Sequence, residues 1–404
     1  MTDVSESGFK EVTRVADARE RLLGAVEPHG RTERVPLQTA DGRVLAEPVV
    51  SDRNVPHYAR AAMDGWAVRA EDTFGAGDRS PAVLRESEGR VGSNEAVRVH
   101  TGSEVPEGAD AVVMVEQTER FGDEVEVFDA VAGGENVAPA GEDVDEGQAL
   151  YEAGHRIRPS DLGLLKSVGV REVSVAERPT VGVVPTGEEL VEFDPEPGEV
   201  IETNGLTVSR YVQRWGGRAE YRNVVTDDES ALRAAIERDL TKDVVVTTGG
   251  SSVGERDLIP EVVEELGEVL VHGVALKPGH PCALGVVRDT PVVMLPGYPV
   301  ACIVNAVQFL RPLMKHREGG ALPPHPTRQA TLSRKIASEP GIRTFARVTL
   351  ESEDGKTVAT PTRASGSGVL SSVALADGWV VVPEGLEGYD EGATVAVEDW
   401  EYQP

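Results

Sequence analysis

Four glycine-containing loops hold most of the residues in this sequence whose types and spacing could do chemistry. They occupy residues 186–190, 248–257, 277–281 and 295–299, and each follows a short apolar run. An apolar run leading into a glycine turn is typical of the carboxyl end of a buried strand in an α/β sheet, where loops gather into a ligand crevice. A turn that needs positive φ would explain any single glycine, but four such loops in one sheet predict a binding site.

The ligand predicted for these loops is a polyanion. Backbone amides exposed at strand ends and helix N-termini bind anions without a cationic side chain. The ligand-binding residues that we expect in the loops are Thr186, Gly187, Gly249, Gly250, Ser251, Ser252, Gly254, His280, Pro296, Gly297 and Pro299.

Charged side chains in and beside the loops are sparse and of two kinds. Glu189, Asp227 and Asp257 could hold a hard divalent cation, and Mg²⁺ is the expected ion because it binds a few carboxylates together with phosphate oxygens. Lys277 and His280 could contact phosphate or other oxyanion oxygens. A solvated surface charge is the simpler interpretation of any one acid in so acidic a chain, whereas Lys277 stands out because lysine is rare here.

A second group of candidate residues lies far away in the sequence. Asp64 precedes a glycine and a predicted strand, after a run of small residues that permits close approach of a ligand or a second chain. The segments 101–110 and 141–143 are similar. Taken alone, each is equally well explained as a plain turn.

Several enzyme classes are disfavoured because their motifs are missing from the sequence. We find no Gly-x-Ser-x-Gly nucleophile elbow, His-Glu-x-x-His pair, Walker A loop or dinucleotide fingerprint. Hydrolase, zinc protease, NTPase and dehydrogenase functions are therefore not expected.

The composition indicates a multidomain globular protein adapted to high salt. The 404 residues are 40% hydrophobic and carry a formal charge of −29, and the acidic residues are spread along the whole chain. Because only seven of the basic residues are Lys, we expect a halophilic, haloarchaeal source, where salt screens the self-repulsion. Such a chain should repel nucleic acid and anionic membranes, so neither is an expected partner.

Cysteine usage and the N-terminus point to the cytoplasm. Cys282 and Cys302 have no metal-binding or redox spacing, so we expect reduced, buried thiols. The polar, acidic start of the chain lacks the pattern of an export signal. The most apolar stretch, 292–310, is interrupted by Pro296, Gly297 and Pro299, too early for a membrane span.

The elements that must position these residues follow from hydrophobic periodicity. The spacing predicts an amphipathic helix over 9–26, β-rich structure over 33–175 with a short helix at 159–168, and alternating strands and helices from 180 to about 316. This alternation favours a mostly parallel sheet with helices on both faces. The expected helices there are 204–215, 228–240 and 299–311, and a linker at 319–326 leads to a small β domain.

Taken in order, these segments resemble the molybdopterin molybdenumtransferase family, called MoeA in prokaryotes and represented by the E domain of gephyrin in animals. The resemblance covers about residues 10–398. It is carried by Ala-Met-Asp-Gly-Trp-Ala at 62–67, by Thr101-Gly102 with the Gly-Ala-Asp-Ala-Val-Val run at 108–113, and most specifically by the Gly-Gly-x-Ser-Val-Gly-x-x-Asp loop that ends at Asp257.

The resemblance implies an elongated α/β and β multidomain fold. Its central molybdopterin-binding three-layer α/β domain would be flanked by β-rich domains and a C-terminal β-barrel-like domain. The expected boundaries are an N-terminal helix at 1–30, a linking domain at 31–48 and 144–176, a β-rich domain at 49–143, the α/β domain at 177–320 and the C-terminal β domain at 327–404.

The reaction implied is insertion of molybdate, or tungstate, into adenylylated molybdopterin, with release of AMP and dependence on Mg²⁺. The resemblance also implies a homodimer with shared active sites. It assigns catalytic roles to Asp64, Thr101, Asp257 and Lys277, metal binding to Asp143, Glu189, Asp227 and Asp257, and substrate binding to Arg347 and Ser367.

Two departures from the family pattern and two rival functions complete the sequence-based hypothesis. His280 stands where the family usually has a second Lys, and Tyr298 replaces the usual Asn. One rival is a molybdopterin adenylyltransferase or CinA-like enzyme of the same α/β fold. The other is a non-catalytic, pterin-binding dimeric scaffold. Asp64, Asp257 and Lys277 are retained, which favours the transferase.

Overall fold

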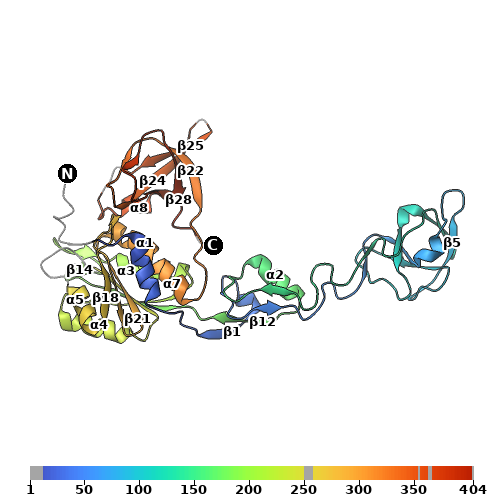
Figure 1. Ribbon diagram of the computed structural model, residues 1–404, viewed down its shortest axis with the longest axis horizontal. Coiled ribbons are helices and arrows are strands. Elements are labelled where there is room, and N and C mark those ends of the chain that lie inside the picture. The colour runs from blue at the N-terminus through green and yellow to red at the C-terminus, as the bar shows by residue number, and fades with distance from the viewer. Residues whose placement is uncertain (1–11, 250–257, 354, 363–365, 403–404) are drawn as a thin grey trace.

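The computed structural model describes residues 12–249, 258–353, 355–362 and 366–402. The molecule is elongated (Figure 1). At one end an α/β sheet lies beside a C-terminal β barrel, and a separate sheet containing β5 (Ala82–Glu86) lies at the other end. A narrow middle part holds α2 (Pro159–Ser167) and the antiparallel pair β1 (Thr32–Pro36) and β12 (Glu172–Ala176).

The α/β sheet has six strands, of which four neighbouring ones are parallel. In spatial order they are β16 (Arg218–Tyr221), β13 (Thr180–Pro185), β17 (Val244–Thr248), β21 (Thr290–Leu295), β20 (Ala283–Val287) and β18 (Glu268–His272). The last two pair antiparallel, so they close one edge of a mostly parallel sheet. The sheet predicted from alternating strands and helices is present.

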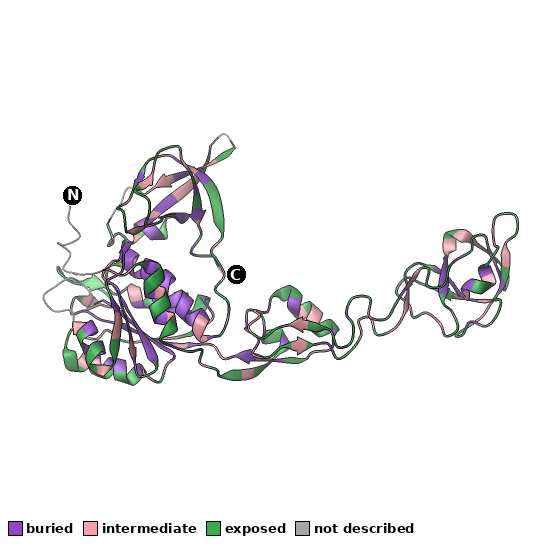
Figure 2. Cartoon of the chain, viewed as in Figure 1, coloured by how far each residue is buried: buried purple, intermediate pink, exposed green. Residues whose placement is uncertain are grey.

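Alternation along the strands creates the three layers, because successive side chains point to opposite faces. Val244 and Val246 belong to one hydrophobic core and Val245 to another on the opposite face. Figure 2 shows buried residues along these strands and the adjoining helix faces. The first core includes α1 (Val15–Gly24), α3 (Asn204–Arg214) and α6 (Pro299–Asn305), and the second includes α4 (Glu229–Asp239) and α5 (Leu258–Leu266).

The helix that begins at Pro299 continues further than predicted. We expected it to end near residue 311, but a π-helical turn (η5, Ala306–Leu310) joins α6 to α7 (Arg311–Arg317). Pro312 has no N–H to donate within the helix. The carbonyl of Gln308 instead accepts a hydrogen bond from Arg19 Nε of α1 at 3.1 Å. None of the helices that the structure describes is long and apolar enough to span a bilayer.

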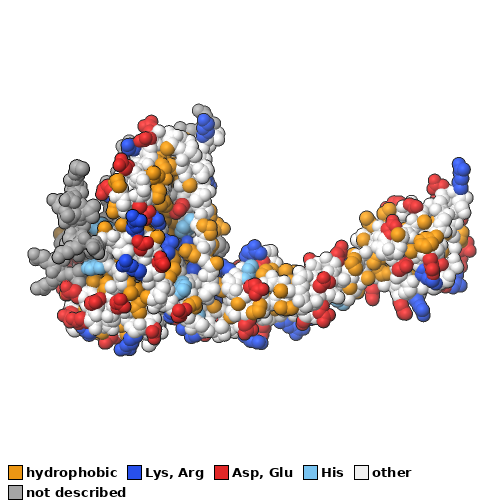
Figure 3. Space-filling model, viewed as in Figure 1, with side chains coloured by type: hydrophobic (Ala, Val, Ile, Leu, Met, Phe, Trp, Pro, Cys, Tyr) orange, Lys and Arg blue, Asp and Glu red, His pale blue; other side chains and the backbone are white. Residues whose placement is uncertain are grey.

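The distal sheet is inserted between two passages of the chain through the middle part. Its strands, in spatial order, are β7 (Ala111–Met114), β4 (Gly65–Val68), β6 (Glu95–Val99), β5, β9 (Glu124–Val127) and β8 (Thr118–Phe121). The outgoing and returning segments pair antiparallel as β2 (Val49–Val50) with β11 (Ala149–Tyr151) and β3 (Arg60–Ala61) with β10 (Val137–Ala138). On the face drawn in Figure 3, acidic side chains are spread over both ends of the molecule.

The C-terminal β strands close into a barrel. Its strands follow one another as β24 (Arg343–Glu353), β25 (Lys356–Pro361), β22 (Thr327–Leu332), β28 (Thr394–Glu398) and β26 (Gly378–Val382), and β26 pairs back with β24. Closure leaves no free sheet edge between these strands. The short strand β19 (Leu276–Lys277), which belongs to the α/β part of the chain, adds to the barrel by pairing with β24.

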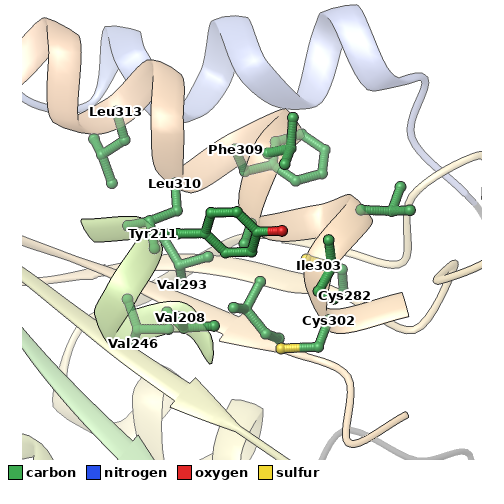
Figure 4. Close-up of a cluster of buried hydrophobic side chains, with 14 of the residues drawn as sticks. Val208, Tyr211, Val246, Cys282, Val293, Cys302, Ile303, Phe309, Leu310 and Leu313 are labelled. Atoms are coloured by element: carbon green, nitrogen blue, oxygen red, sulfur yellow. The ribbon is translucent and has the colours of Figure 1, made fainter. Parts of the chain in front are cut away.

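One core of the α/β part contains both cysteines (Figure 4). Cys282 and Cys302 are free and fully buried among apolar side chains such as Val293 and Ile303. Burial raises the pKa of both thiols, which keeps them protonated. The prediction of reduced, buried cysteines is confirmed.

Candidate active site

Three of the four predicted loops converge at the carboxyl ends of β13, β17 and β21. The backbone N–H of Thr186 donates to Thr248 O, and that of Gly249 donates to Leu295 O, both at 3.1 Å. A Cβ on Gly249 would lie 2.1 Å from Thr186 O, and its φ is +119°. Only glycine fits there, because a side chain would both clash and strain the backbone. A Cβ on Gly297 would lie 3.4 Å from Gly249 Cα, so the loop at 295–299 also touches Gly249.

The loop at 277–281 connects β18 to β20. Because β18 and β21 both pair antiparallel with β20, β18 runs in the same direction as the strands that precede the other three loops. Gly279 has a φ of +115° and its carbonyl accepts a hydrogen bond from Asn305 Nδ2 at 2.9 Å. The loop is thereby fixed to helix α6. This loop therefore follows a strand parallel to the others, as expected, and only β20 is reversed.

Lys277 and His280 differ in charge. Lys277 Nζ donates to Glu339 Oε1 at 2.9 Å, and both side chains are largely exposed. Burial, and then the neighbouring Lys277, lower the pKa of His280 below its usual value of 6.5. His280 is therefore neutral at pH 7, so Lys277 supplies the fixed positive charge of this loop.

Glu189 belongs to the loop at 186–190, and Asp227 lies close to it. Burial, and then the negative charges of Glu189 and Glu188, raise the pKa of Asp227. The N–H of Gly187 donates to Val225 O at 3.1 Å, which draws the two segments together. The described residues contain no group of three His, Cys, Asp or Glu side chains that could hold a metal ion. The predicted ligand Asp257 lies outside the described residues, as do Gly250, Ser251, Ser252 and Gly254.

The barrel contributes two further predicted residues. Ser367 O accepts a hydrogen bond from Val300 N, the second residue of α6, at 3.0 Å, so Ser367 lies next to the loop at Pro296, Gly297 and Pro299. Arg347 is buried on β24 and donates to Phe345 O and to Ser372 Oγ, each at 3.4 Å. Burial lowers its pKa. Arg347 is thus placed within the barrel rather than on an open surface.

Asp64 and Thr101 meet at one end of the distal sheet. Asp64 Oδ1 accepts hydrogen bonds from the backbone N–H of Thr101 at 2.7 Å and from its hydroxyl at 2.9 Å. These two bonds hold the pKa of Asp64 below its usual value. The glycine after Asp64 is required by packing rather than by a turn, because a Cβ on Gly65 would lie 1.9 Å from Val113 O.

The candidate residues are therefore divided between the two ends of the molecule. Asp64 and Thr101 flank strands β4 and β6 of the distal sheet, whereas the four loops belong to the α/β sheet at the opposite end (Figure 1). Asp143 lies on the returning segment, where its N–H donates to Val55 O at 2.9 Å. One chain does not bring these two groups together.

Comparison with known proteins identifies the family. The sequence matches the MoeA N-terminal region (domain I and II) over residues 13–169, a probable molybdopterin binding domain over 182–316 and the MoeA C-terminal region (domain IV) over 329–400. It is 36% identical over 390 residues to a protein of Methanocaldococcus jannaschii named for molybdopterin biosynthesis, with 94% of each chain covered. The chain belongs to the MoeA family.

Other MoeA-family proteins are similar along the same length. A molybdopterin molybdenumtransferase of Bacillus subtilis is 33% identical over 398 residues, covering 94% of this chain and 93% of the relative. The crystal structure of a MoeA protein from Pyrococcus horikoshii matches with a TM-score of 0.84 and 34% identity, over 96% of this chain and 99% of that one. The resemblance and the multidomain α/β and β fold predicted from sequence are confirmed.

Membership of the MoeA family weakens the first rival interpretation. The relatives match the flanking β-rich parts as well as the α/β part, and an adenylyltransferase or CinA-like enzyme would need only the latter. Relatives over most of the chain are named as transferases. The chain is accordingly a transferase of molybdenum cofactor biosynthesis.

Two polar residues at the crevice, Asn204 and Thr248, were missed by sequence reasoning. Asn204 Nδ2 donates to Gly297 O at 2.6 Å and so links α3 to the loop at 295–299. The hydroxyls of Thr186 and Thr248 are buried without a hydrogen-bond partner in the described part of the chain. An Asn at the start of a predicted helix was the only signal for Asn204. Thr248 had none, because threonine is common in strands, whereas Thr186 was among the predicted ligand-binding residues.

Proposed function

We propose that this chain inserts molybdate, or tungstate, into adenylylated molybdopterin and releases AMP. Its family and the names of its relatives support molybdenum insertion into molybdopterin as the general role. The observation that carries the chemistry is the contact of Thr186, Gly249 and Gly297 at one sheet edge. The N–H groups of Thr186, Gly187 and Gly249 already donate to backbone carbonyls, so an anionic pterin phosphate would bind through other groups at this edge, beside two carboxylates and one lysine.

Mg²⁺ is the cofactor that we assign to the carboxylates. Glu189 and Asp227 fit this role, since like charges already raise the pKa of Asp227 and a bound cation would remove that repulsion. We expect Asp257 to complete the set. When bound, Mg²⁺ would neutralise charge between the anionic substrates.

The chain's own residues would act mainly by positioning the two anions. Lys277 would exchange Glu339 for an oxygen of the oxyanion, which costs little because that ion pair is exposed. Asp64 remains ionised, since Thr101 donates two hydrogen bonds to it. Because binding holds the two reactants together, the entropy cost of bringing them together is met before molybdenum–oxygen bonds exchange for molybdenum–sulfur bonds.

We further propose a homodimer in which each site is completed by the partner subunit. The division of the candidate residues between two ends of the molecule supports this arrangement. Asp64, Thr101 and Asp143 of one subunit would face the four loops of the other. No nucleic acid or membrane partner is included in this proposal.

The decisive assay mixes purified protein in high salt with adenylylated molybdopterin, Mg²⁺ and molybdate. We expect AMP release that depends on molybdate. AMP formation from ATP and free molybdopterin would instead support the adenylyltransferase rival. Tight pterin binding without any turnover would support the scaffold. Competition between molybdate and tungstate in the same assay would identify the preferred oxyanion.

A further inference from the structure

A cleft of about 480 Å³ lies where α1, α7 and the barrel meet. It contains none of the candidate active-site residues. Its lining comprises Arg19, Val307, Gln308, Arg311, Pro312, Leu322, Pro323, Pro324, His325, Thr327, Arg343, Phe345, Val381 and Glu398. The segment from Leu322 to Thr327, which leads into the barrel, forms part of its wall.

The charge of this cleft is opposite to that of the whole chain. Arg19, Arg311 and Arg343 line it, against the single lining carboxylate of Glu398, in a protein of net charge −29. Glu398 already accepts a hydrogen bond from Trp379 Nε1 at 2.9 Å, and Glu384 pairs with Arg343 at 3.1 Å. The cleft therefore keeps an excess of positive charge.

Among these residues, Arg311 carries the positive charge whose burial is energetically unfavourable. Its side chain is buried, and it forms no ion pair with any carboxylate in the described part of the chain. Burial, and then the charge of Arg19, lower its pKa to about 10. On its other side a smaller pocket of about 170 Å³ is lined by five more cationic residues and two acidic ones, which are Arg43, Arg156, Arg178, Arg214, Lys315, Asp41 and Glu318. A buried charge without a counter-ion is unfavourable unless something compensates it.

Hydrogen bonds within the protein use only some of the N–H groups of these guanidinium side chains. Arg311 donates to Pro323 O at 2.6 Å and bonds to His325 Nε2 at 3.2 Å, which uses two of its five N–H groups. Arg19 Nε donates to Gln308 O, the carbonyl that Pro312 leaves without its helical donor. Burial, and then Arg311, lower the pKa of His325 to about 4, so this ring adds no charge at neutral pH.

We propose that the cleft binds a tetrahedral oxyanion between Arg19, Arg311 and Arg343. Phosphate, sulfate and molybdate share this chemistry, and the planar guanidinium group pairs with two oxygens of such an ion at once. The bound dianion supplies the counter-charge that Arg311 lacks. This site is separate from the proposed catalytic crevice and does not depend on the proposed reaction.

The test is calorimetric titration of the full-length protein with phosphate and with sulfate, at one fixed KCl concentration. Arg311→Gln and Arg343→Gln should each weaken binding about tenfold or more, because a charge-assisted contact is lost. Arg21→Gln is the matched control, since Arg21 is exposed on the same helix as Arg19 and does not line the cleft. Arg311→Lys keeps the positive charge but not the planar guanidinium group, and it replaces Arg311→Gln in the test if that variant does not fold.

Molybdate is titrated in a Lys277→Ala background, so that binding at the catalytic crevice does not contribute. If molybdate binds more tightly than phosphate, the occupant is the oxyanion substrate, and the reverse order identifies phosphate. The proposal is overturned if no oxyanion binds saturably, or if the Arg311 and Arg343 variants bind as tightly as the Arg21 control.

Discussion

Asp64 receives two hydrogen bonds from one residue, Thr101, through its backbone N–H and its hydroxyl. Both donors reach the same carboxylate oxygen, Oδ1, and the side chain of Asp64 is exposed. Because these bonds lower the pKa of Asp64, the carboxylate stays ionised through the neutral range. Such a group, held rigidly at the far end of a long chain, is suited to act on something that the same chain does not carry.

The first prediction uses this separation. Asp64→Asn and Asp227→Asn should each lower turnover about 100-fold or more, yet a mixture of the two should recover about a quarter of wild-type activity. Half of randomly mixed dimers contain both variants, and one of their two sites is then intact. Subunits are mixed, allowed to exchange and assayed for AMP release.

If the site is shared, two variants that both damage its distal half should not complement each other. Asp64→Asn mixed with Thr101→Ala should recover nothing, because every site then has a damaged distal half. Recovery in that control, or failure of the first mixture despite demonstrated subunit exchange, would contradict the shared-site proposal.

The second prediction concerns the contact between the first two loops. Gly249→Ala should lower the thermal midpoint more than Gly198→Ala does. Both glycines have positive φ, so each substitution adds backbone strain of about 1–3 kcal/mol. Only Gly249 also brings its Cβ against Thr186 O, whereas nothing lies near Gly198. Equal losses, measured by calorimetry in high salt, would show that the two loops do not touch as described.

The third prediction concerns the acidic pair and its dependence on pH. The folded pKa of Asp227 is raised above its usual value of 3.8, so the unfolded state loses this proton first as pH rises. Stability is therefore lost over that range and the penalty persists at neutral pH. Asp227→Asn should be more stable than wild type in EDTA but gain less from Mg²⁺.

Mg²⁺ stabilisation of the wild type should also weaken as pH falls through the raised pKa, since protonation competes with the cation. Glu237→Gln, an exposed substitution on α4, is the control and should respond to Mg²⁺ as wild type does. If Asp227→Asn and Glu237→Gln give equal thermal shifts with Mg²⁺, the assignment of Asp227 to the metal is wrong.

Features of the fold and site that depend on residues close together in the sequence could be predicted, whereas contacts between distant segments could not. The loops after β13, β17 and β21 were predicted because each apolar run and its glycine turn are contiguous in sequence. The contacts of Asn204 with Gly297 and of Val300 with Ser367 were not, because they join elements far apart in the chain.

Local rules failed where a distant residue replaced a missing interaction. Pro312 disfavours a continuing helix, and the predicted helix stopped at residue 311, just before it. The chain instead continues to Arg317, because a π-helical turn and Arg19 accommodate the freed carbonyl of Gln308. Nothing near Pro312 in the sequence indicates a donor from α1.

The fourth prediction separates the catalytic from the structural role of Lys277. Its ion pair with Glu339 is exposed, so Lys277→Ala should change the free energy of unfolding by about 0.5 kcal/mol or less. AMP release should nevertheless fall about 100-fold. Glu339→Gln removes the same ion pair and should keep its turnover. A Lys277→Ala variant that keeps wild-type turnover would remove Lys277 from the mechanism.

The fifth prediction follows from the dispersed acidic surface (Figure 3). With a net charge of −29, the folded chain repels itself, and this repulsion is screened by salt. The thermal midpoint should rise steadily between about 0.1 and 2 M KCl, where the Debye length falls below 10 Å. A midpoint that does not change over this range would contradict adaptation to high salt.

The two-residue strand β19 gives the barrel a role beyond that of an appended module. Leu276 and Lys277 pair with Arg343 and Thr344, and the N–H of Val300 at the start of α6 bonds to Ser367 O. A chain truncated after α7 would keep every strand of the α/β sheet and yet lose the partners of both loops. Deletion of the C-terminal barrel would thus remove the strand that holds Lys277 and also Phe345, Trp379 and Trp400 from the core of the α/β part.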